Sequence, residues 1–419
     1  MTDTRQPALT SGSLHRSIRL LAVPMVLEMA MESVFAVADI YFVGRISSDA
    51  VAAVGITETL LWIVYSIGFG LEIAVTAMVA RRIGEQKSEE ATRAAVQGNW
   101  LGVAVSLPIA AAGILFAETL FIMMGATPEL AAYGSYYLGI AFGGNLVILL
   151  LFINNAVFRG AGDARLAMWS LWIANGANLI LDPCLIFGLG PFPELGLKGA
   201  AIATVVGRGI GVLFQYFVLF TRPGRLRLRA KKLGLEPRLI ARLGRLSLGG
   251  VLQALVENVS WIVLVRMVAL FGSASMAGYT IGLRILVFAF LPAYGLANAA
   301  ATLVGQNLGA RKPDRAERAV WLTGGYAAVA LLLATLVFVP TARPLVELFT
   351  DTAAVAGHAE RCLRIISYGY VFFAVGMTVT QALNGAGDTV TPMWINIAVL
   401  WFVKLPLAYA LAHRLSFRP

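Results

Sequence analysis

The first long apolar run of the chain, residues 17–44, contains three acidic residues, Glu28, Glu32 and Asp39. At about 100° per residue, these positions fall within roughly 40° of one another on a helix and form one stripe. A carboxylate at membrane depth costs about 2.5–3.5 kcal/mol, so the stripe must face water, a cavity or other polar groups. Pro24 cannot donate a backbone hydrogen bond and is predicted to be a hinge in this helix.

Composition defines the fold class. Apolar residues make up 58% of the chain and charged residues 13%, and the apolar residues fall in blocks of about twenty or more, which predicts an all-α polytopic membrane protein. Eleven spans are expected, at about residues 17–43, 50–80, 96–117, 131–153, 166–187, 196–220, 246–271, 276–308, 319–341, 363–383 and 391–412.

Every second loop is basic, and the most basic segment, residues 222–245, follows the sixth span. Short loops rich in Lys and Arg remain in the cytoplasm, which predicts a cytoplasmic N-terminus in a plasma (inner) membrane. This explains the net charge of +10 without nucleic acid, for which interleaved aromatic residues are missing. The basic residues that follow the second, fourth and eighth spans are Arg81, Arg82, Lys87, Arg93, Arg159, Arg165, Arg311, Lys312, Arg315 and Arg318.

Residues in the two halves of the sequence match at one constant offset of 225 residues, and the alignment needs no gap between the matching positions. Glu32 aligns with Glu257, Gly84 with Gly309, and the segment 160–163 with the identical segment 385–388. Several matches at one offset indicate a duplication of like-oriented copies related by an axis along the membrane normal. The fold expected is therefore two pseudo-symmetric six-helix lobes.

The repeat also predicts the domain bounds. Residues 1–221 form the N-terminal lobe, 222–245 a basic cytoplasmic linker, and 246–419 a C-terminal lobe. The second lobe lacks a counterpart of residues 196–220, so we expect that a twelfth helix is missing and that the native chain is longer.

Four patterns together resemble the multidrug and toxic compound extrusion (MATE) family, and in particular its DinF-like members, over essentially the whole chain. They are Pro24 with Asp39 and Gly44, the segment 305–310, the segment 159–163, and Asn178 with Asp182-Pro183 followed by 199–204. The resemblance implies a secondary antiporter that exports amphipathic, often cationic compounds against inward Na⁺ or H⁺. Members of the family normally have twelve helices.

Asp39, Asn178, Asp182 and Thr204 are the predicted cation-coupling residues. They offer carboxylate, amide and hydroxyl oxygens on three helices, a ligand set suited to Na⁺, and a partly desolvated carboxylate also gains proton affinity. The family resemblance assigns the same four positions to a cation site in the first lobe. The alternative is that Asp182 only caps a helix end before Pro183 and that Asp39 lies at the membrane interface near Gly44.

The candidates for the substrate cavity are Glu28, Glu32, Glu257, Met29 and Gln253. Glu257 resembles an acid that NorM-like members carry in their second lobe. An ion pair with Arg284 or Arg266 is the alternative for Glu257.

The competing functions are a flippase of a lipid-linked precursor from the same superfamily and a membrane-embedded prenyl transferase. A flippase would be expected to have a strongly cationic cavity, whereas the stripe of the first helix is acidic. A transferase would need Asp-rich motifs for Mg²⁺ and diphosphate, and the sequence has none. We therefore expect no enzyme activity, no cofactor beyond the coupling ion, small amphipathic substrates and membrane lipids as partners, and a monomer.

Overall fold

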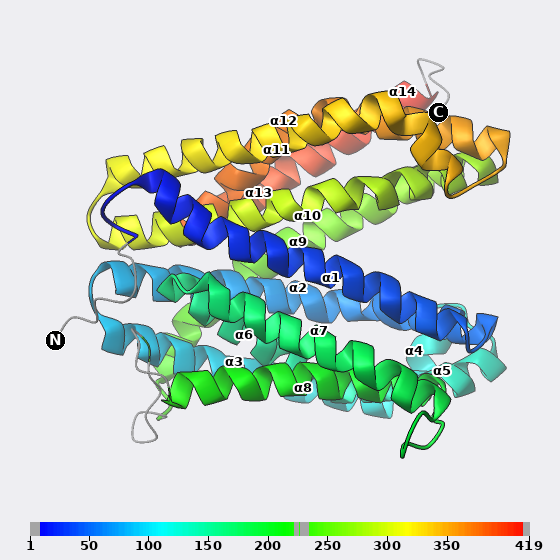
Figure 1. Cartoon of the computed structure of the whole chain (residues 1–419), viewed down its shortest axis with the longest axis horizontal. Coiled ribbons are helices and arrows are strands. Elements are labelled where there is room, and N and C mark those ends of the chain that lie inside the picture. The colour runs from blue at the N-terminus through cyan, green and yellow to red at the C-terminus, as the bar shows by residue number, and fades with distance from the viewer. Residues whose placement is uncertain (1–8, 222–225, 227–233, 414–419) are drawn as a thin grey trace.

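The computed structural model describes residues 9–221, 226 and 234–413. Eleven of the helices in these ranges are long and apolar enough to cross a membrane, which confirms the predicted all-α membrane protein. Figure 1 shows them side by side along one direction. The helices of the described residues are α1 (Leu14–Gly44), α2 (Ser48–Gly84), α3 (Ser88–Leu115), α4 (Ala117–Met123), α5 (Pro128–Gly143), α6 (Asn145–Ala161), α7 (Ala164–Phe187), α8 (Leu197–Thr221), α9 (Pro237–Ala269), α10 (Ser273–Gly309), α11 (Pro313–Glu347), α12 (Ala353–Ala386), α13 (Val390–Asn396), the π-helix η2 (Ile397–Lys404) and α14 (Leu405–His413). α4 is too short to be a span. The other elements make the eleven spans, because α5 and α6 form one span, as do α13, η2 and α14.

The boundaries of these helices repeat at the offset found in the sequence. α2 and α10 both begin and end at that offset, α3 and α11 begin at it, and α6 and α12 end at it. The turns repeat as well. Gly162 and Gly387 have φ of 90° and 88°, the left-handed conformation that glycine adopts without steric cost. Gln86 and Arg311, also one repeat apart, are the non-glycine residues of the described ranges with positive φ.

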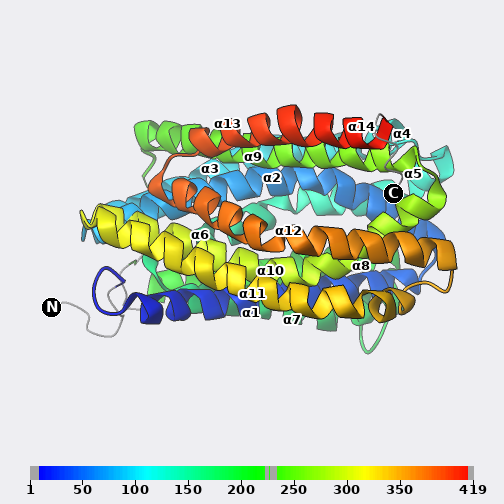
Figure 2. The same ribbon diagram turned by 90° about the horizontal axis from the view of Figure 1, so that it is seen from above.

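The helices form two groups, which we call the first half (α1–α8) and the second half (α9–α14). In Figure 1, α10–α12 lie in the upper group and α3, α7 and α8 in the lower one, while α1 runs between them. Figure 2 shows α9 beside α13 and α14 along one edge of the bundle. α1 packs against both α7 and α10, and α2 packs against both α6 and α9. α1 and α2 therefore join the two halves.

The halves meet most closely at one end of the bundle, where the α2–α3 and α10–α11 loops lie. We call this the basic end, because Arg81, Arg82, Lys87, Arg311 and Lys312 are there. A Cβ atom built on Gly84 would come within 3.0 Å of the backbone of Gln306, and one on Gly309 within 3.0 Å of the backbone of Arg81. Arg81 and Gln306 are themselves one repeat apart, so the two contacts are mutual, as at a two-fold interface.

Polar contacts between the halves gather at the same end. Gln306 donates to the Gly160 carbonyl at 2.8 Å, Lys312 donates to the Thr10 carbonyl at 2.8 Å, and Arg315 donates to the Gly12 carbonyl at 2.9 Å. At the opposite end, Gly44 and Gly55 have no neighbour within 4 Å of a built Cβ. The halves are thus closed together at the basic end.

The fourth predicted span, 131–153, lies within the span Pro128–Ala161. The helix of this span breaks at Gly144 into α5 and α6, where a Cβ would collide with Val205 of α8. Two other predictions from the sequence need correction. Arg159 is not a loop residue but a buried residue of α6. The predicted linker is shorter than expected, since α9 begins at Pro237; residues 222–225 and 227–233 lie outside the described residues.

Candidate functional site

The four predicted cation-coupling residues lie together inside the first half. Asp39 lies near the C-terminal end of α1, Asn178 and Asp182 lie on one face of α7, and Thr204 lies on α8. Asp39, Asn178 and Asp182 are all buried. α7 continues through Pro183 to Phe187, so the alternative in which Asp182 caps a helix end is wrong.

Hydrogen bonds connect three of these residues. With the Asn178 amide oriented to satisfy its neighbours, its nitrogen donates to Asp182 Oδ2 at 2.6 Å and its oxygen accepts from the Thr204 hydroxyl at 3.1 Å and the Thr204 N–H at 3.0 Å. Asp39 Oδ1 and Asp182 Oδ1 are buried without a hydrogen-bond partner. Two buried carboxylate oxygens therefore remain free to bind a proton or a cation.

A pocket beside these residues contains ionisable groups that the sequence analysis did not select. Asp39 and Thr204 line it together with Glu58, Tyr65, Tyr137 and Arg208. Arg208 Nη2 lies 3.5 Å from the Tyr65 hydroxyl. Three acids, Asp39, Glu58 and Asp182, thus stand against one guanidinium, so the site is negative when all are ionised. The position of Glu58 and Arg208 inside predicted spans was the signal that could have found them.

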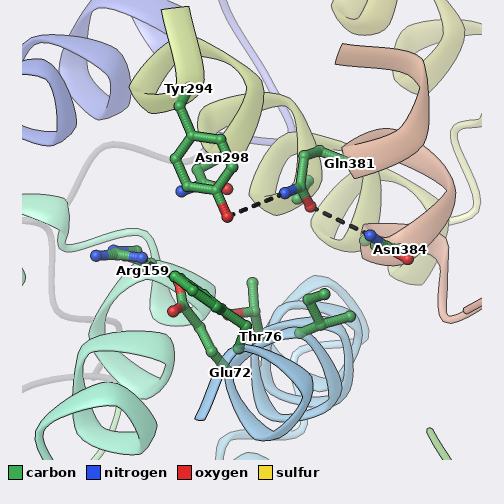
Figure 3. A pocket seen from close by; sticks show the side chains of 11 residues that line it. Glu72, Thr76, Arg159, Tyr294, Asn298, Gln381 and Asn384 are labelled. Atoms are coloured by element: carbon green, nitrogen blue, oxygen red, sulfur yellow. Dashed lines mark hydrogen bonds and ion pairs between the residues drawn. The ribbon is translucent and has the colours of Figure 1, made fainter. Parts of the chain in front are cut away.

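A second pocket lies between the two halves (Figure 3). Glu72, Thr76 and Arg159 face it from the first half, and Tyr294, Asn298, Gln381 and Asn384 face it from the second. Gln381 donates to the Tyr294 hydroxyl at 3.4 Å, and Asn384 donates to Gln381 Oε1 at 3.3 Å. One wall is therefore charged and the other is made of neutral amides and a phenol.

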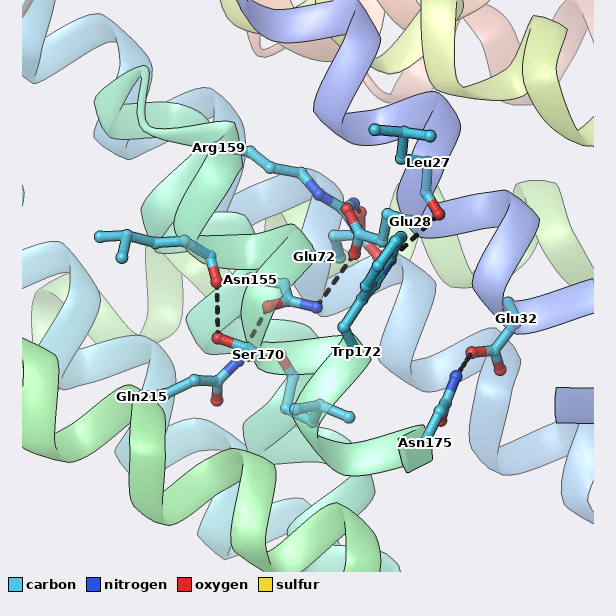
Figure 4. Close-up of polar contacts among 12 residues, drawn as sticks. Leu27, Glu28, Glu32, Glu72, Asn155, Arg159, Ser170, Trp172, Asn175 and Gln215 are labelled. Carbon is cyan, nitrogen blue, oxygen red and sulfur yellow. Dashed lines mark hydrogen bonds and ion pairs between the residues drawn. The ribbon is translucent and has the colours of Figure 1, made fainter. Parts of the chain in front are cut away.

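Glu28 and Glu32, two of the cavity candidates, point into the first half (Figure 4). Glu28 is buried and pairs with Arg159, while Asn155 donates to Glu28 Oε1 at 3.2 Å. Glu32 is half-buried and accepts a hydrogen bond of 2.9 Å from Asn175. The acidic stripe of α1 therefore faces polar partners on α6 and α7.

The other candidates have different surroundings. Glu257 is exposed and accepts from Asn396 at 3.1 Å. Within the described ranges its cationic neighbour is Lys404 rather than Arg266 or Arg284. Gln253 is buried and bonded to Asn384, and Met29 is half-buried on α1. Pro24 lies inside the continuous helix α1. The roles of these residues stay predictions.

A duplicated bundle of membrane-spanning helices with acid-lined pockets inside it defines a multi-pass membrane transport protein. The MatE family model matches residues 24–184 and 251–410. The chain belongs to the MatE family, as the sequence predicts. The two matched stretches correspond to the two copies of the repeat.

Relatives and solved structures support the same class. The chain is 25% identical over 403 residues to a probable multidrug resistance protein NorM of Thermotoga maritima, covering 95% of this chain and 86% of that one. It is 26% identical over 403 residues to a protein of Shewanella oneidensis named FAD transporter, covering 96% and 88%. A structure described as the outward-facing conformation of a multidrug resistance MATE family transporter has a TM-score of 0.92 at 24% identity, covering 100% of this chain and 93% of that one. The last likeness shows the two-lobe fold.

Proposed function

We propose that this protein is a cation-coupled antiporter that exports small amphipathic, cationic molecules by alternating access. H⁺ or Na⁺ binds at Asp39, Asn178, Asp182 and Thr204. The observation that carries the proposal is the pair of unpartnered, buried carboxylate oxygens on Asp39 and Asp182. A buried carboxylate without a partner is costly, and binding a proton or a hard cation removes that cost.

The charge of the pocket that Asp39 and Thr204 line supports a cationic substrate. Asp39 and Glu58 outnumber Arg208 there, so an empty, ionised site attracts positive charge. The alternative function is that of a flippase for a lipid-linked precursor. The diphosphate of such a substrate would be repelled by these carboxylates.

The contacts between the halves support an assignment of the conformation. The basic end, which the positive-inside rule places in the cytoplasm, is the end at which the halves are closed. The proposed state is therefore open to the outside. When the coupling ion fills the acid site, α1 bends at Pro24, the pocket shrinks and the substrate leaves.

The membrane potential drives export in proportion to the net charge that crosses. One charge that crosses the membrane supplies about 2.3 kcal/mol per 100 mV, which sustains roughly a fifty-fold gradient of a neutral substrate. Exchange of one monovalent ion for one monovalent cationic substrate moves no net charge, so the concentration gradient of the ion drives that export. This holds only if the ion and the substrate cannot occupy their sites in the same state.

The test is transport in proteoliposomes with a fluorescent cationic dye, under separately imposed Na⁺ and pH gradients. Asp39→Asn and Asp182→Asn should abolish uphill export while dye binding persists, because an amide resembles the neutral carboxyl but cannot cycle. Asp49→Asn is the matched control, since Asp49 is an exposed acid in the first turn of α2. Wild-type uphill export by both site variants would refute the assignment and make Glu257 the leading coupling residue.

A further inference from the structure

A buried charge cluster in the first half contains two carboxylates and one guanidinium. Arg159 pairs with Glu28 through one terminal nitrogen and with Glu72 through the other (Figure 4). The exposed fractions are 1% for Glu28, 8% for Glu72 and 6% for Arg159. If both acids are ionised, the cluster keeps one uncompensated negative charge away from water, an arrangement that strongly favours gaining a cation.

Unpartnered atoms show that the cluster has room for a further bond. Glu28 Oε2 and Arg159 Nε are buried and have no hydrogen-bond partner. Glu28 Oε1 already accepts from both Arg159 and Asn155. The free oxygen of Glu28 is therefore the position at which a proton or a small cation would be held.

The repeat provides an internal comparison. One repeat after Glu28 and Arg159 come Gln253 and Asn384, and these two are also bonded to each other, at 3.1 Å and 3.3 Å. The position equivalent to Glu72 is Ala297. The same contact between equivalent helices is thus made by a neutral amide pair in the second half. Packing the helices does not require the charges of the first half, so these need another explanation.

The cluster opens onto the pocket between the halves (Figure 3). Several residues that line this pocket are related by the repeat, including Arg159 with Asn384 and Thr76 with Ala301, which places it on the pseudo-two-fold axis. The other titratable groups that face the cluster are Glu32 on α1 and Tyr294 on α10. The pocket is lined from both halves, so separating them at the basic end would admit water to it.

We propose that Glu28 and Glu72 bind one monovalent cation, a proton or Na⁺, and that this ion holds the basic end closed. The inference rests on the proposed transport function but concerns a site separate from Asp39 and Asp182. In the closed state the excess charge is shut away from water, so the ion binds tightly. In the open state water stabilises the ionised carboxylates and the ion binds weakly. An ion with such a difference in affinity shifts the equilibrium toward closure.

The test measures the separation of the halves at the basic end. Spin labels are placed at Ser88 and Asp314, both exposed near the α2–α3 and α10–α11 loops, after Cys184 and Cys362 are replaced by alanine. The full chain also carries Asp39→Asn and Asp182→Asn, so ion binding at those acids cannot contribute. Distance distributions are recorded in lipid from pH 5 to 9 without Na⁺, and then against Na⁺ at fixed pH.

The ratio of closed to open molecules should fall by up to about ten-fold per pH unit as the pH rises if one proton is linked. If the ion is Na⁺, the ratio should instead rise with Na⁺ concentration. Glu28→Gln alone, which leaves Glu72 to balance the charge of Arg159, should remain closed and lose the dependence. Glu129→Gln, at an exposed acid in the first turn of α5, is the matched control and should keep the dependence.

Two results would overturn the proposal. One is a distance distribution that is insensitive to both pH and Na⁺ before Glu28 is changed. The other is an unchanged dependence in folded Glu28→Gln. Folding is checked by thermal denaturation of each variant. Because the site acids are already neutralised in this background, such a failure leaves the proposed function intact. Failure of the transport test in turn does not alter the distances.

Discussion

Gly84 on α2 stands directly against the backbone of Gln306 on α10, so close that a Cβ atom on Gly84 would lie within 3.0 Å of it. The equivalent glycine of the second half, Gly309, stands against Arg81 in the same way. The closed basic end therefore depends on two glycines that lack a side chain, one from each copy of the repeat.

Gly84→Ala should shift the protein toward separation of the halves at the basic end. Overpacking a tight contact costs about 1–3 kcal/mol, which reduces the ratio of closed to open molecules by about five- to 150-fold. The same spin-label distances between positions 88 and 314 measure this. Gly55→Ala on the same helix is the control, because its Cβ meets nothing within 4 Å. Equal distance distributions for the two variants would contradict the prediction.

Thr204→Val should weaken binding of the coupling ion. The substitution preserves the shape of the side chain and removes the hydroxyl that bonds to Asn178. A lost hydrogen bond of about 0.5–1.5 kcal/mol corresponds to a two- to ten-fold higher ion concentration for half-maximal transport. The ion dependence of dye export measures it. Thr59→Val, at an exposed threonine of α2 that bonds only within its own helix, should have no effect.

Arg159→Gln should be among the most destabilising single substitutions, because it leaves Glu28 and Glu72 buried without their counter-charge. Removing one partner of a buried ion pair costs about 3–5 kcal/mol, so the thermal denaturation midpoint should fall clearly. Adding Glu28→Gln and Glu72→Gln should restore most of it. The corresponding change at the exposed Arg343, which pairs with Glu347, should leave the midpoint unchanged; a similar loss at both positions would argue against a buried charge effect.

Asp388 should stabilise α13 in a pH-dependent manner. It lies between α12 and α13. A hydrogen bond with the Thr391 side chain, and a second from the Thr391 backbone N–H at 3.0 Å, lower the pKa of the Asp388 carboxyl below its usual value. A lowered folded-state pKa means that the stabilisation is present above the unfolded-state pKa and is lost as the pH falls through the folded one. Asp388→Ala should therefore cost about 1 kcal/mol at neutral pH, and the difference from wild type should shrink below about pH 4. Denaturation midpoints at several pH values measure this, and a constant difference would rule it out.

Much of the architecture could be predicted from the chain itself. Apolar blocks of membrane length locate the spans, since nearly every backbone group must be satisfied within a helix in lipid. The offset between matching landmarks predicts the duplication, and α2 and α10 keep it at both ends. Asp39 and Asp182 could be selected because an acid inside an apolar run needs a polar partner.

The sequence therefore predicts which positions are helical, which positions of the two copies are equivalent, and which acids must be kept out of contact with lipid. The partner of each charge is defined only once the helices are packed. The sequence predicts that Arg159 is a loop residue, yet it lies inside α6 between Glu28 and Glu72. These two acids are 131 and 87 residues away from it in the sequence. Helical periodicity defines the face of a side chain but not the helix that packs there, and that choice depends on contacts between residues distant in the chain.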